Sequence, residues 1–363
     1  KTVRVELGER AYDIHIGRGM PVGAAVSGKE GLRALVVSDS HVEPLYGTRC
    51  DRALRDRGLE VSRVTVPAGE KSKDLKFVND VYGGAIRAGL DRSSVMVALG
   101  GGMIGDLTGF AAATFLRGIR FIQAPTSLLA MVDSSVGGKT GVNLAQGKNL
   151  VGVFHQPVEV VADLTTLETL PDREYLSGMA EIVKYGVIWD AVLFSLIEEN
   201  LQELRDRNLD FLETVIARCC EIKAEIVVMD ERESGVRAVL NFGHTLGHAV
   251  ETVSGYDGCL HGEAVSAGLV FAVELSAVAK GFPAGDSRRV ADLLGRLGLP
   301  VNPAQLAGGR PWEEIRNAMM TDKKARHQAP RFVLAQQVGA VVFGCEVPEE
   351  VLKAVWDRVT RVP

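Results

Sequence analysis

The first part of the chain alternates short runs of β-branched residues with stretches of helical spacing, and this alternation constrains the fold more than any other feature. Apolar runs without a polar break, such as Ala34–Val37, indicate strands that are buried on both faces, as in a parallel sheet. Helical stretches between successive strands predict βαβ units. Strands are expected at Val3–Leu7, Leu32–Ser38, Leu59–Val66, Val95–Leu99, Arg120–Gln123 and Val158–Val161.

The second part of the chain changes to helical spacing, with a clear apolar stripe over Phe211–Met229. The only late strands expected are Phe332–Leu334 and Ala340–Phe343. A chain of 363 residues exceeds the usual size of one hydrophobic core. We therefore predict an α/β, Rossmann-like N-terminal domain over residues 1–163 and a mostly α-helical C-terminal domain over residues 164–363.

The composition excludes several classes of protein. A net charge of -5 leaves no general basic surface for nucleic acid and no polybasic segment for a membrane. The longest nearly apolar stretch, 95–115, contains Asp106 and five glycines, so it is not expected to span a bilayer. The five cysteines form no CxxC pair and are interpreted as reduced packing residues, which favours a cytoplasmic protein.

A glycine-rich loop follows the expected strand at Val95–Leu99. The run Gly100-Gly-Gly-Met-Ile-Gly-Asp106 has the GxGxxG spacing, which lets backbone N–H groups approach a pyrophosphate at a helix N-terminus. The alternative is that these glycines serve tight packing alone. The acidic residue of the usual dinucleotide site is missing about 20 residues later, which speaks against a standard Rossmann site. Asp39, directly after a strand, is a better candidate for a ribose contact.

Two short segments combine glycine with lysine. The run from Asp133 to Lys139 ends in Gly-Gly-Lys, and Lys148-Asn149 follows another glycine. Such steps suit a phosphate or carboxylate, because the glycine backbone admits the anion and the ammonium group neutralises it. The alternative is a pair of exposed surface lysines. The first glycine of a P-loop is absent here, so ATP-driven phosphoryl transfer loses support.

Two further lysines lie on helical segments. Lys223 falls on the apolar stripe, so it either extends to the surface or reaches a buried anionic site. Lys184 is one turn from Glu181 in a mostly apolar segment, where the alternative is a surface ion pair.

A set of metal-ligand residue types lies in the second half: Glu181, Asn241, His244, His248 and His261. His244 and His248 are four residues apart and share a helix face, with Asn241 one turn earlier. One carboxylate and two imidazoles hold a divalent cation while leaving positions open for substrate oxygens. The segment His-Thr-Leu-Gly-His lacks the glutamate of HExxH, which argues against a zinc protease. The pattern predicts a catalytic metal and acid–base site.

Taken together, these segments resemble the 3-dehydroquinate synthase family. The matching runs, in family order over about residues 39 to 324, are PAGEKSK, LGGGMIGDLTGFAAATFLRG, PTSLLAMVDSSVGGKTGVN, GKNLVGVFHQP, TLPDREYLSGMAEIVKYG, LNFGHTLGHAVE, HGEAV and TDKK. The resemblance implies an NAD-binding α/β domain, a helical second domain, a homodimer, and a divalent metal, Zn²⁺ or alternatively Co²⁺. Two positions depart from the pattern, since Met103 replaces a smaller residue and no glycine follows Lys324.

The resemblance also implies a role for individual residues. The metal ligands would be Glu181, His244 and His261. NAD would be held by Asp39, Glu70, Lys73, Gly101, Gly102, Asp106, Thr126, Ser127, Lys148 and Thr169. Catalytic residues would be His248, Asn241, Lys148, Asp133, Lys184, Lys223 and Arg237. Further substrate contacts would be Arg117, Lys139, Asn149 and Lys324.

The activity implied is conversion of 3-deoxy-D-arabino-heptulosonate 7-phosphate to 3-dehydroquinate and phosphate. It proceeds by transient oxidation, phosphate β-elimination, reduction, ring opening and aldol closure. Alternatives are another sugar phosphate cyclase, of the valiolone or inosose type, and a metal-dependent polyol dehydrogenase. The dehydrogenase would accumulate NADH and would not need so many cationic residues. A non-catalytic NAD-binding protein is the third alternative.

Overall fold

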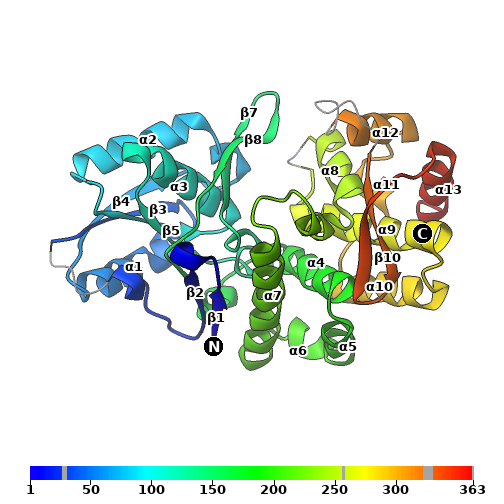
Figure 1. The fold of residues 1–363 in the computed structure, drawn as a ribbon, viewed down its shortest axis with the longest axis horizontal. Coiled ribbons are helices and arrows are strands. Elements are labelled where there is room, and N and C mark those ends of the chain that lie inside the picture. Colours follow the sequence, from blue (N-terminus) through cyan, green and yellow to red (C-terminus); the bar gives the residue numbers. More distant parts are fainter. Residues whose placement is uncertain (27–30, 256–257, 322–329, 362–363) are drawn as a thin grey trace. The chain divides into compact units, whose positions relative to one another are not determined.

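The computed structural model describes residues 1–26, 31–255, 258–321 and 330–361 (Figure 1). By their contacts the residues form two compact units. The first contains Lys1–Leu170 and Leu209–Val228, and the second contains Pro171–Asn208 and Met229–Pro363. This grouping rests on contacts between residues, so residues 209–228 belong to the first unit although they come late in the sequence. It does not test the domain boundary expected after residue 163, which stays a prediction.

The first unit is built on a seven-stranded sheet with the order β1-β2-β9-β6-β5-β3-β4. All neighbouring strands in it are parallel except β1 and β2. The strands are β1 (Thr2–Val5), β2 (Tyr12–Gly17), β3 (Arg33–Asp39), β4 (Glu60–Val66), β5 (Val95–Gly100), β6 (Arg120–Pro125) and β9 (Glu159–Asp163). The parallel α/β architecture expected from the apolar runs is confirmed. β2 was not expected, because polar residues interrupt its apolar ones.

Helices cover both faces of this sheet (Figure 1). α1 (Glu43–Arg55) packs on one face, where the core includes Val36 and Val97. α2 (Leu75–Arg87) and α3 (Gly102–Thr114) pack on the other face, around Leu35 and Met96. Every residue of β5 is buried, as expected for a central parallel strand.

The strand order creates a topological switch point between β3 and β5. From β3 the chain moves to β4 on one side, and from β5 it moves to β6 on the other, with α1 and α3 on opposite faces. Open α/β sheets bind ligands beyond the carboxyl ends of the strands at such a point. Asp39 ends β3 and Gly100 ends β5, so both lie at this edge.

Two further elements belong to the first unit. β7 (Lys139–Leu144) and β8 (Gly147–Phe154) form an antiparallel hairpin, which the sequence did not predict. α7 (Leu209–Met229) is the helix expected from the apolar stripe, and Lys223 on it is buried.

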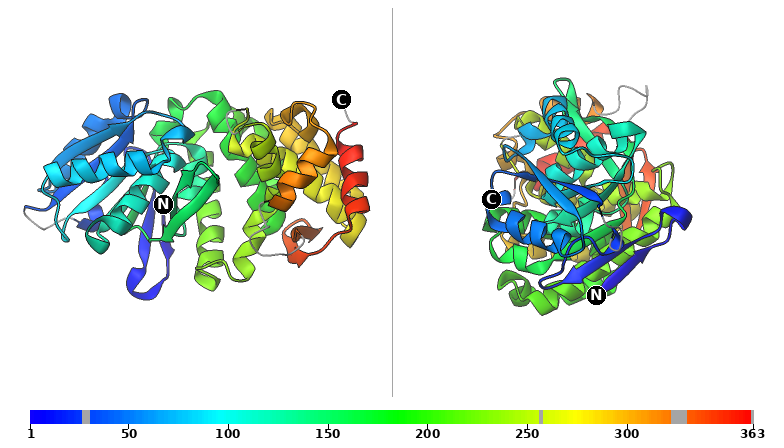
Figure 2. Two further views of the ribbon diagram at one scale, coloured as in Figure 1. Left: turned by 90° about the horizontal axis from the view of Figure 1, so that it is seen from above. Right: turned by 90° about the vertical axis from the view of Figure 1, so that its left-hand side faces the viewer.

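The second unit is mainly helical (Figure 2). Its helices are α4 (Asp172–Ile188), α5 (Ala191–Glu199), α6 (Leu201–Arg205), α8 (His244–Val253), α9 (His261–Lys280), α10 (Ala284–Leu297), α11 (Pro303–Leu306), α12 (Trp312–Thr321) and α13 (Glu349–Val359). β10 (Phe332–Gln337) and β11 (Ala340–Cys345) are the two late strands that were expected, and they pair antiparallel. α9 is long and apolar enough to cross a membrane by length and composition, yet 72% of its most apolar 18-residue window is buried. It packs against α4, α8, α10, α13 and β10.

Candidate active site

The three predicted metal ligands meet inside the second unit. Glu181 comes from α4, His244 begins α8 and His261 begins α9. The Nε2 atoms of His244 and His261 lie 3.6 Å and 3.7 Å from Oε1 of Glu181. One ligand atom from each residue lies within 4.8 Å of the others, and Glu181 is fully buried. This donor set of one carboxylate and two imidazoles fits a divalent transition metal with open positions.

The ring of His244 is oriented by the backbone. Its Nδ1 lies 3.1 Å from the carbonyl oxygen of Phe242. Since a carbonyl oxygen only accepts, Nδ1 carries the proton and Nε2 presents its lone pair toward Glu181. Burial, with a contribution from Lys184, lowers the pKa of His244 to about 3. His244 is therefore neutral, which is the form that binds a metal.

His261 lies between two carboxylates. Its Nδ1 is 3.6 Å from Oε2 of Glu251, on the side opposite Glu181. Burial acts to lower the pKa of His261, but Glu181 and Glu251 outweigh it and raise the pKa to about 10. The pair of carboxylates thus favours a cation at this position, and a metal would displace the proton that occupies it.

A second group of potential ligands shares His261 with the first. It consists of His248, Glu251 and His261. Because Glu251 faces Nδ1 and Glu181 faces Nε2, the two groups use opposite ring nitrogens. A metal bound through Nε2 therefore leaves Glu251 as the acceptor for Nδ1–H, as is usual for histidine ligands. The ring of His248 lies beside both other histidines, at centroid distances of 5.3 Å and 6.2 Å.

Close helix packing sets the position of His261. The next residue, Gly262, donates its N–H to Oγ of Ser177 on α4 at 3.0 Å. A Cβ on Gly262 would lie 1.8 Å from the carbonyl oxygen of Ser177. Only glycine allows α9 to begin this close to α4, one turn before Glu181.

Two predicted cations are buried in the second unit. Lys184 is 1% exposed and forms an ion pair with Glu181, so the alternative of a surface pair is wrong. Arg237 is 1% exposed and donates from Nη1 to the carbonyl oxygen of Glu231 at 2.5 Å. Buried cations are rare unless they serve an anionic partner, which favours an anion-binding role for this region.

The loop before Arg237 is organised by a carboxylate. Asp230 accepts from the backbone N–H groups of Ser234, Gly235 and Arg237 at 2.9, 2.7 and 3.0 Å. Burial alone would raise the pKa of Asp230, but these hydrogen bonds lower it to about 2. The loop leads into the 3₁₀ helix Val236–Asn241, which carries both Arg237 and Asn241.

In the first unit, Lys223 meets Asp133. Its Nζ donates to the backbone carbonyl of Asp133 at 2.6 Å and to Oδ1 at 2.7 Å, and the lysine is 5% exposed. The alternative in which Lys223 extends to the surface is therefore wrong. Asp133 lies in the short π-helical turn Ala130–Ser134.

A second polar cluster joins four other predicted residues. Nζ of Lys73 donates to Oδ2 of Asp106 and to Oδ1 of Asn149, both at 2.5 Å. Asn143 links Glu70 to the same cluster, since its Nδ2 donates to Oε1 of Glu70 at 2.8 Å. Burial raises the pKa of Asp106, although Lys73 opposes the shift. The structure thus brings Glu70, Lys73, Asp106 and Asn149 together.

The glycines of the loop after β5 differ in how much room a side chain would have at each position. A Cβ at Gly100 would lie 2.8 Å from Ile104, a Cβ at Gly102 would lie 2.8 Å from Oγ of Ser134, and a Cβ at Gly105 would lie 2.7 Å from the side-chain amide of Gln123. A Cβ at Gly101 would instead meet Oγ of Ser127 at 3.4 Å, which is an ordinary contact distance, and α3 begins at Gly102. The packing alternative therefore has support at all three spaced glycines of the motif, whereas Gly101 between them is not confined by packing.

Asp39 and Thr126 lie at the same sheet edge. Oδ1 of Asp39 accepts from the N–H groups of His41 and Val42 at 2.8 and 3.1 Å, and these bonds hold the turn that leads into α1. Thr126 directly follows β6 and is buried.

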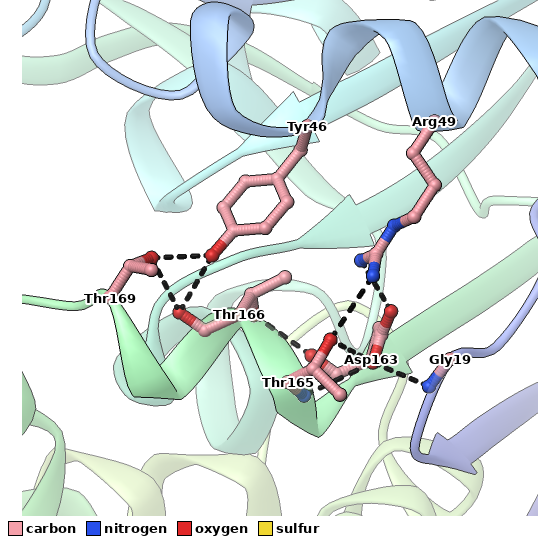
Figure 3. Close-up of polar contacts among 7 residues, drawn as sticks. All are labelled: Gly19, Tyr46, Arg49, Asp163, Thr165, Thr166 and Thr169. Atoms are coloured by element: carbon pink, nitrogen blue, oxygen red, sulfur yellow. Dashed lines mark hydrogen bonds and ion pairs between the residues drawn. The ribbon is translucent and has the colours of Figure 1, made fainter.

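Thr169 belongs to a polar network beside α1 (Figure 3). Its Oγ1 contacts the hydroxyl of Tyr46, which also donates to the carbonyl oxygen of Thr166 at 3.4 Å. Nearby, Nη2 of Arg49 donates to Oδ2 of Asp163 at 2.5 Å. A cavity of about 220 Å³ adjoins this network at the carboxyl ends of β5, β6 and β9, lined among others by Tyr46, Leu99, Ala124, Thr126, Val161 and Thr166.

Three predicted residues lie on other segments of the first unit. Arg117 is exposed in the turn after α3, with a φ of 68°, and within the described part of the chain no hydrogen bond or ion pair links it to another predicted site residue. Lys139 is exposed at the start of β7, and Lys148 is half-buried on β8. Lys324 lies outside the described residues.

Sequence reasoning missed three residues that contact the site. Glu251 faces His261, Asn143 contacts Glu70, and Glu233 accepts from Nδ2 of Asn241 at 2.8 Å. Glu233 also has a φ of 56°. The signal for Glu251 was its place one turn beyond His248, whereas Glu233 lies in a charged run that reads as a solvated loop.

The fold is shared with solved sugar phosphate cyclases. The 2-epi-5-epi-valiolone synthase of Streptomyces hygroscopicus subsp. jinggangensis 5008, with NAD⁺ and Zn²⁺ bound, matches with a TM-score of 0.87 and 28% identity over 96% of each chain. A 2-deoxy-scyllo-inosose synthase complexed with carbaglucose-6-phosphate, NAD⁺ and Co²⁺ matches with a TM-score of 0.86 and 27% identity over 99% of each chain. The architecture is therefore that of a sugar phosphate cyclase.

Sequence comparison narrows the class to one family. Models described as 3-dehydroquinate synthase N-terminal and C-terminal match residues 63–177 and 178–325. The 3-dehydroquinate synthase of Geobacter metallireducens is 49% identical over 342 residues, which cover 93% of this chain and 94% of that protein. The chain belongs to the 3-dehydroquinate synthase family.

Proposed function

We propose that the chain converts 3-deoxy-D-arabino-heptulosonate 7-phosphate to 3-dehydroquinate and phosphate, with NAD⁺ and a divalent metal as cofactors. The observation that carries this proposal is the cluster of Glu181, His244 and His261 in a chain of this family. The metal would be Zn²⁺, with Co²⁺ as the alternative, as the cofactors of the two solved cyclases suggest. When bound, the metal polarises a substrate hydroxyl, and NAD⁺ accepts and later returns a hydride.

The residues at the cluster fit a metal. Glu181 would supply an oxygen, and His244 and His261 would each supply Nε2. The carbonyl oxygen of Phe242 and the carboxylate of Glu251 would hold the other ring nitrogens, which fixes both rings and strengthens them as ligands.

The sheet edge of the first unit fits a dinucleotide. The N-terminus of α3 at Gly101–Gly102 would receive the pyrophosphate, because its amide groups and dipole favour an anion. Asp39 would accept from ribose hydroxyls with Oδ2, since the described contacts of its carboxylate use Oδ1. The remaining contacts would come from Glu70, Lys73, Asp106, Thr126, Ser127, Lys148 and Thr169.

The cations would bind the two acidic groups of the substrate. The substrate carries a carboxylate and a phosphate, and Lys184, Arg237 and Lys223 are buried cations. Asp133 would hold Lys223 in position through the bonds at 2.6 and 2.7 Å. Further contacts would come from Arg117, Lys139, Lys148, Asn149 and Lys324.

His248 would move protons during the reaction. It lies beside the metal-ligand cluster without being part of the Glu181, His244 and His261 group. Asn241, held by Glu233, would orient the substrate hydroxyl that exchanges this proton. Phosphate leaves by β-elimination once the adjacent carbon is oxidised, and the cations would stabilise its charge.

Two finer expectations accompany the proposal. We expect a homodimer and a cytoplasmic location, as the family resemblance implies. Sedimentation at two protein concentrations tests the first, and a monomer at both would contradict it.

The test is a stoichiometric assay with catalytic amounts of NAD⁺. The proposal expects one phosphate and one dehydroquinate per substrate, no net NADH, and loss of turnover after chelation of the metal. Net NADH from a simple polyol would instead favour the dehydrogenase. Phosphate release only from a heptulose or hexose phosphate would favour another cyclase.

A further inference from the structure

The β7–β8 hairpin contains an irregularity where two predicted site residues lie. The strand pairs on either side of it leave Asn143 alone on β7 opposite residues 148–150 on β8. Asn149 has a φ of 54°, a left-handed conformation that asparagine adopts more readily than most residues. A bulge re-aims side chains and interrupts the ladder of backbone hydrogen bonds. It therefore decides how Lys148 and Asn149 are presented.

The side chain of Asn143 spans this bulge and the loop before α2. Its Oδ1 accepts from the backbone N–H of Asn149 at 3.0 Å, and its Nδ2 donates to Oε1 of Glu70 at 2.8 Å. Its own N–H donates to the carbonyl oxygen of Lys73 at 2.8 Å. Since Nζ of Lys73 donates back to Oδ1 of Asn149 at 2.5 Å, the contacts close into a ring.

We propose that Asn143 is a positioning residue that holds Glu70, Lys73 and the Lys148–Asn149 bulge in one arrangement, and this rests on the proposed function for the roles of those residues. An amide is the side chain that suits the position, because it donates to a carboxylate and accepts from a backbone N–H at once. A carboxylate would accept in both directions, and an apolar side chain would do neither.

Two substitutions separate the two halves of this role. Asn143→Asp keeps an acceptor for the Asn149 N–H but places a second carboxylate against Glu70. We expect KM for NAD⁺ to rise about 10- to 100-fold, since a charge-assisted bond is lost, while kcat changes less than about twofold. Asn143→Ala also removes the acceptor for the Asn149 N–H, so the side chain of residue 143 no longer holds the bulge. We expect kcat to fall as well, because Lys148 loses its fixed position.

Reversing the polarity of the contact should rescue the first variant. In the double variant Asn143→Asp with Glu70→Gln, the glutamine amide donates to the aspartate. Measured against Glu70→Gln alone, Asn143→Asp should then raise KM for NAD⁺ by less than about threefold, because the two positions are coupled. A loss of the same size in both backgrounds would overturn the proposal, because a purely structural effect of Asn143→Asp would not depend on residue 70.

A readout independent of activity is amide hydrogen exchange at Asn149. Asn143→Ala should accelerate exchange there by roughly tenfold, whereas Asn143→Asp should leave it near the wild-type rate. Gln146→Ala, in the exposed turn of the same hairpin, is the matched control and should change neither exchange nor kinetics. Wild-type exchange at Asn149 in Asn143→Ala would overturn the proposal.

The outcomes distinguish this inference from the proposed function. If the wild-type enzyme turns over and the Asn143 variants match it in KM, kcat and exchange, the inference fails and the proposed function stands. If the wild-type enzyme does not release phosphate, the proposed function fails, and the exchange rates at Asn149 still decide whether Asn143 holds the bulge.

Discussion

Substitution of Gly262 by alanine should separate metal binding from the overall fold. Gly262 directly follows His261 on α9 and faces the backbone of Ser177 on α4, one turn before Glu181. An added Cβ would lie 1.8 Å from the carbonyl oxygen of Ser177, so the start of α9 must recede by about 1.6 Å to reach an ordinary contact of 3.4 Å. Both partners are backbone or Cβ atoms, which no change of side-chain rotamer can relieve.

The size of that shift determines the expected loss. Metal–ligand distances tolerate deviations of only about 0.2 Å, so a movement of His261 by more than 1 Å removes it from a common site with Glu181 and His244. Because the loss of an outer-shell partner alone weakens metal binding about 10- to 100-fold, we expect more than ~100-fold for a displaced ligand. Overpacking should also destabilise the protein by roughly 1–3 kcal/mol.

The assay is competition for Zn²⁺ against a chromophoric chelator, together with thermal unfolding of the metal-free protein. Gly285→Ala on α10 is the control, because its Cβ meets no atom within 4 Å. It should keep wild-type metal affinity and gain up to about 1 kcal/mol, since alanine is the better helix former. Wild-type affinity in Gly262→Ala would refute the reasoning, because His261 would then not depend on this contact.

Three other predictions follow from the second unit. Glu251→Leu should weaken Zn²⁺ binding about 10- to 100-fold and Glu251→Gln less, as measured by chelator competition, and equal affinities would contradict an orienting role. His248→Ala should keep the metal while kcat falls about 10²- to 10⁴-fold, and metal loss with an unchanged rate would contradict its acid–base role. The pKa of Asp230 is lowered from 3.8 to about 2, so its stabilising contribution is present above about pH 4 and is lost as the pH falls toward 2. The difference in unfolding temperature between the wild type and Asp230→Asn should therefore shrink over that range, and a constant difference would contradict it.

The sheet was predictable where its strands are buried on both faces. β3 and β5 are continuous apolar runs, and such runs leave few alternatives. The β7–β8 hairpin was not predictable from propensity, because Gly141 and Gly152 face each other and favour no strand on their own. Contacts between the two strands explain the glycine at position 152, since a Cβ there would lie 2.4 Å from the carbonyl oxygen of Thr140.

The candidate site was predictable in its chemistry and less so in its supports. Glu181 and the histidines carry ligand atoms, so their residue types alone suggested a metal. Lys223 left two alternatives from its position on a helix, and only its contact with Asp133 decided between them. Asn143 acts through contacts with segments distant in sequence, which no local pattern encodes. Glu251 lies one turn beyond His248, but its contact with His261 on the next helix could not be read from that spacing.

The most direct test of the account is product identification after incubation with three sugar phosphates in parallel: 3-deoxy-D-arabino-heptulosonate 7-phosphate, a heptulose 7-phosphate and a hexose 6-phosphate. Each reaction contains Zn²⁺ and catalytic NAD⁺. The account predicts that only the first releases phosphate and yields 3-dehydroquinate, because it alone brings a carboxylate as well as a phosphate to the buried cations. Turnover of either sugar phosphate that lacks a carboxylate, without turnover of the heptulosonate, would contradict this function.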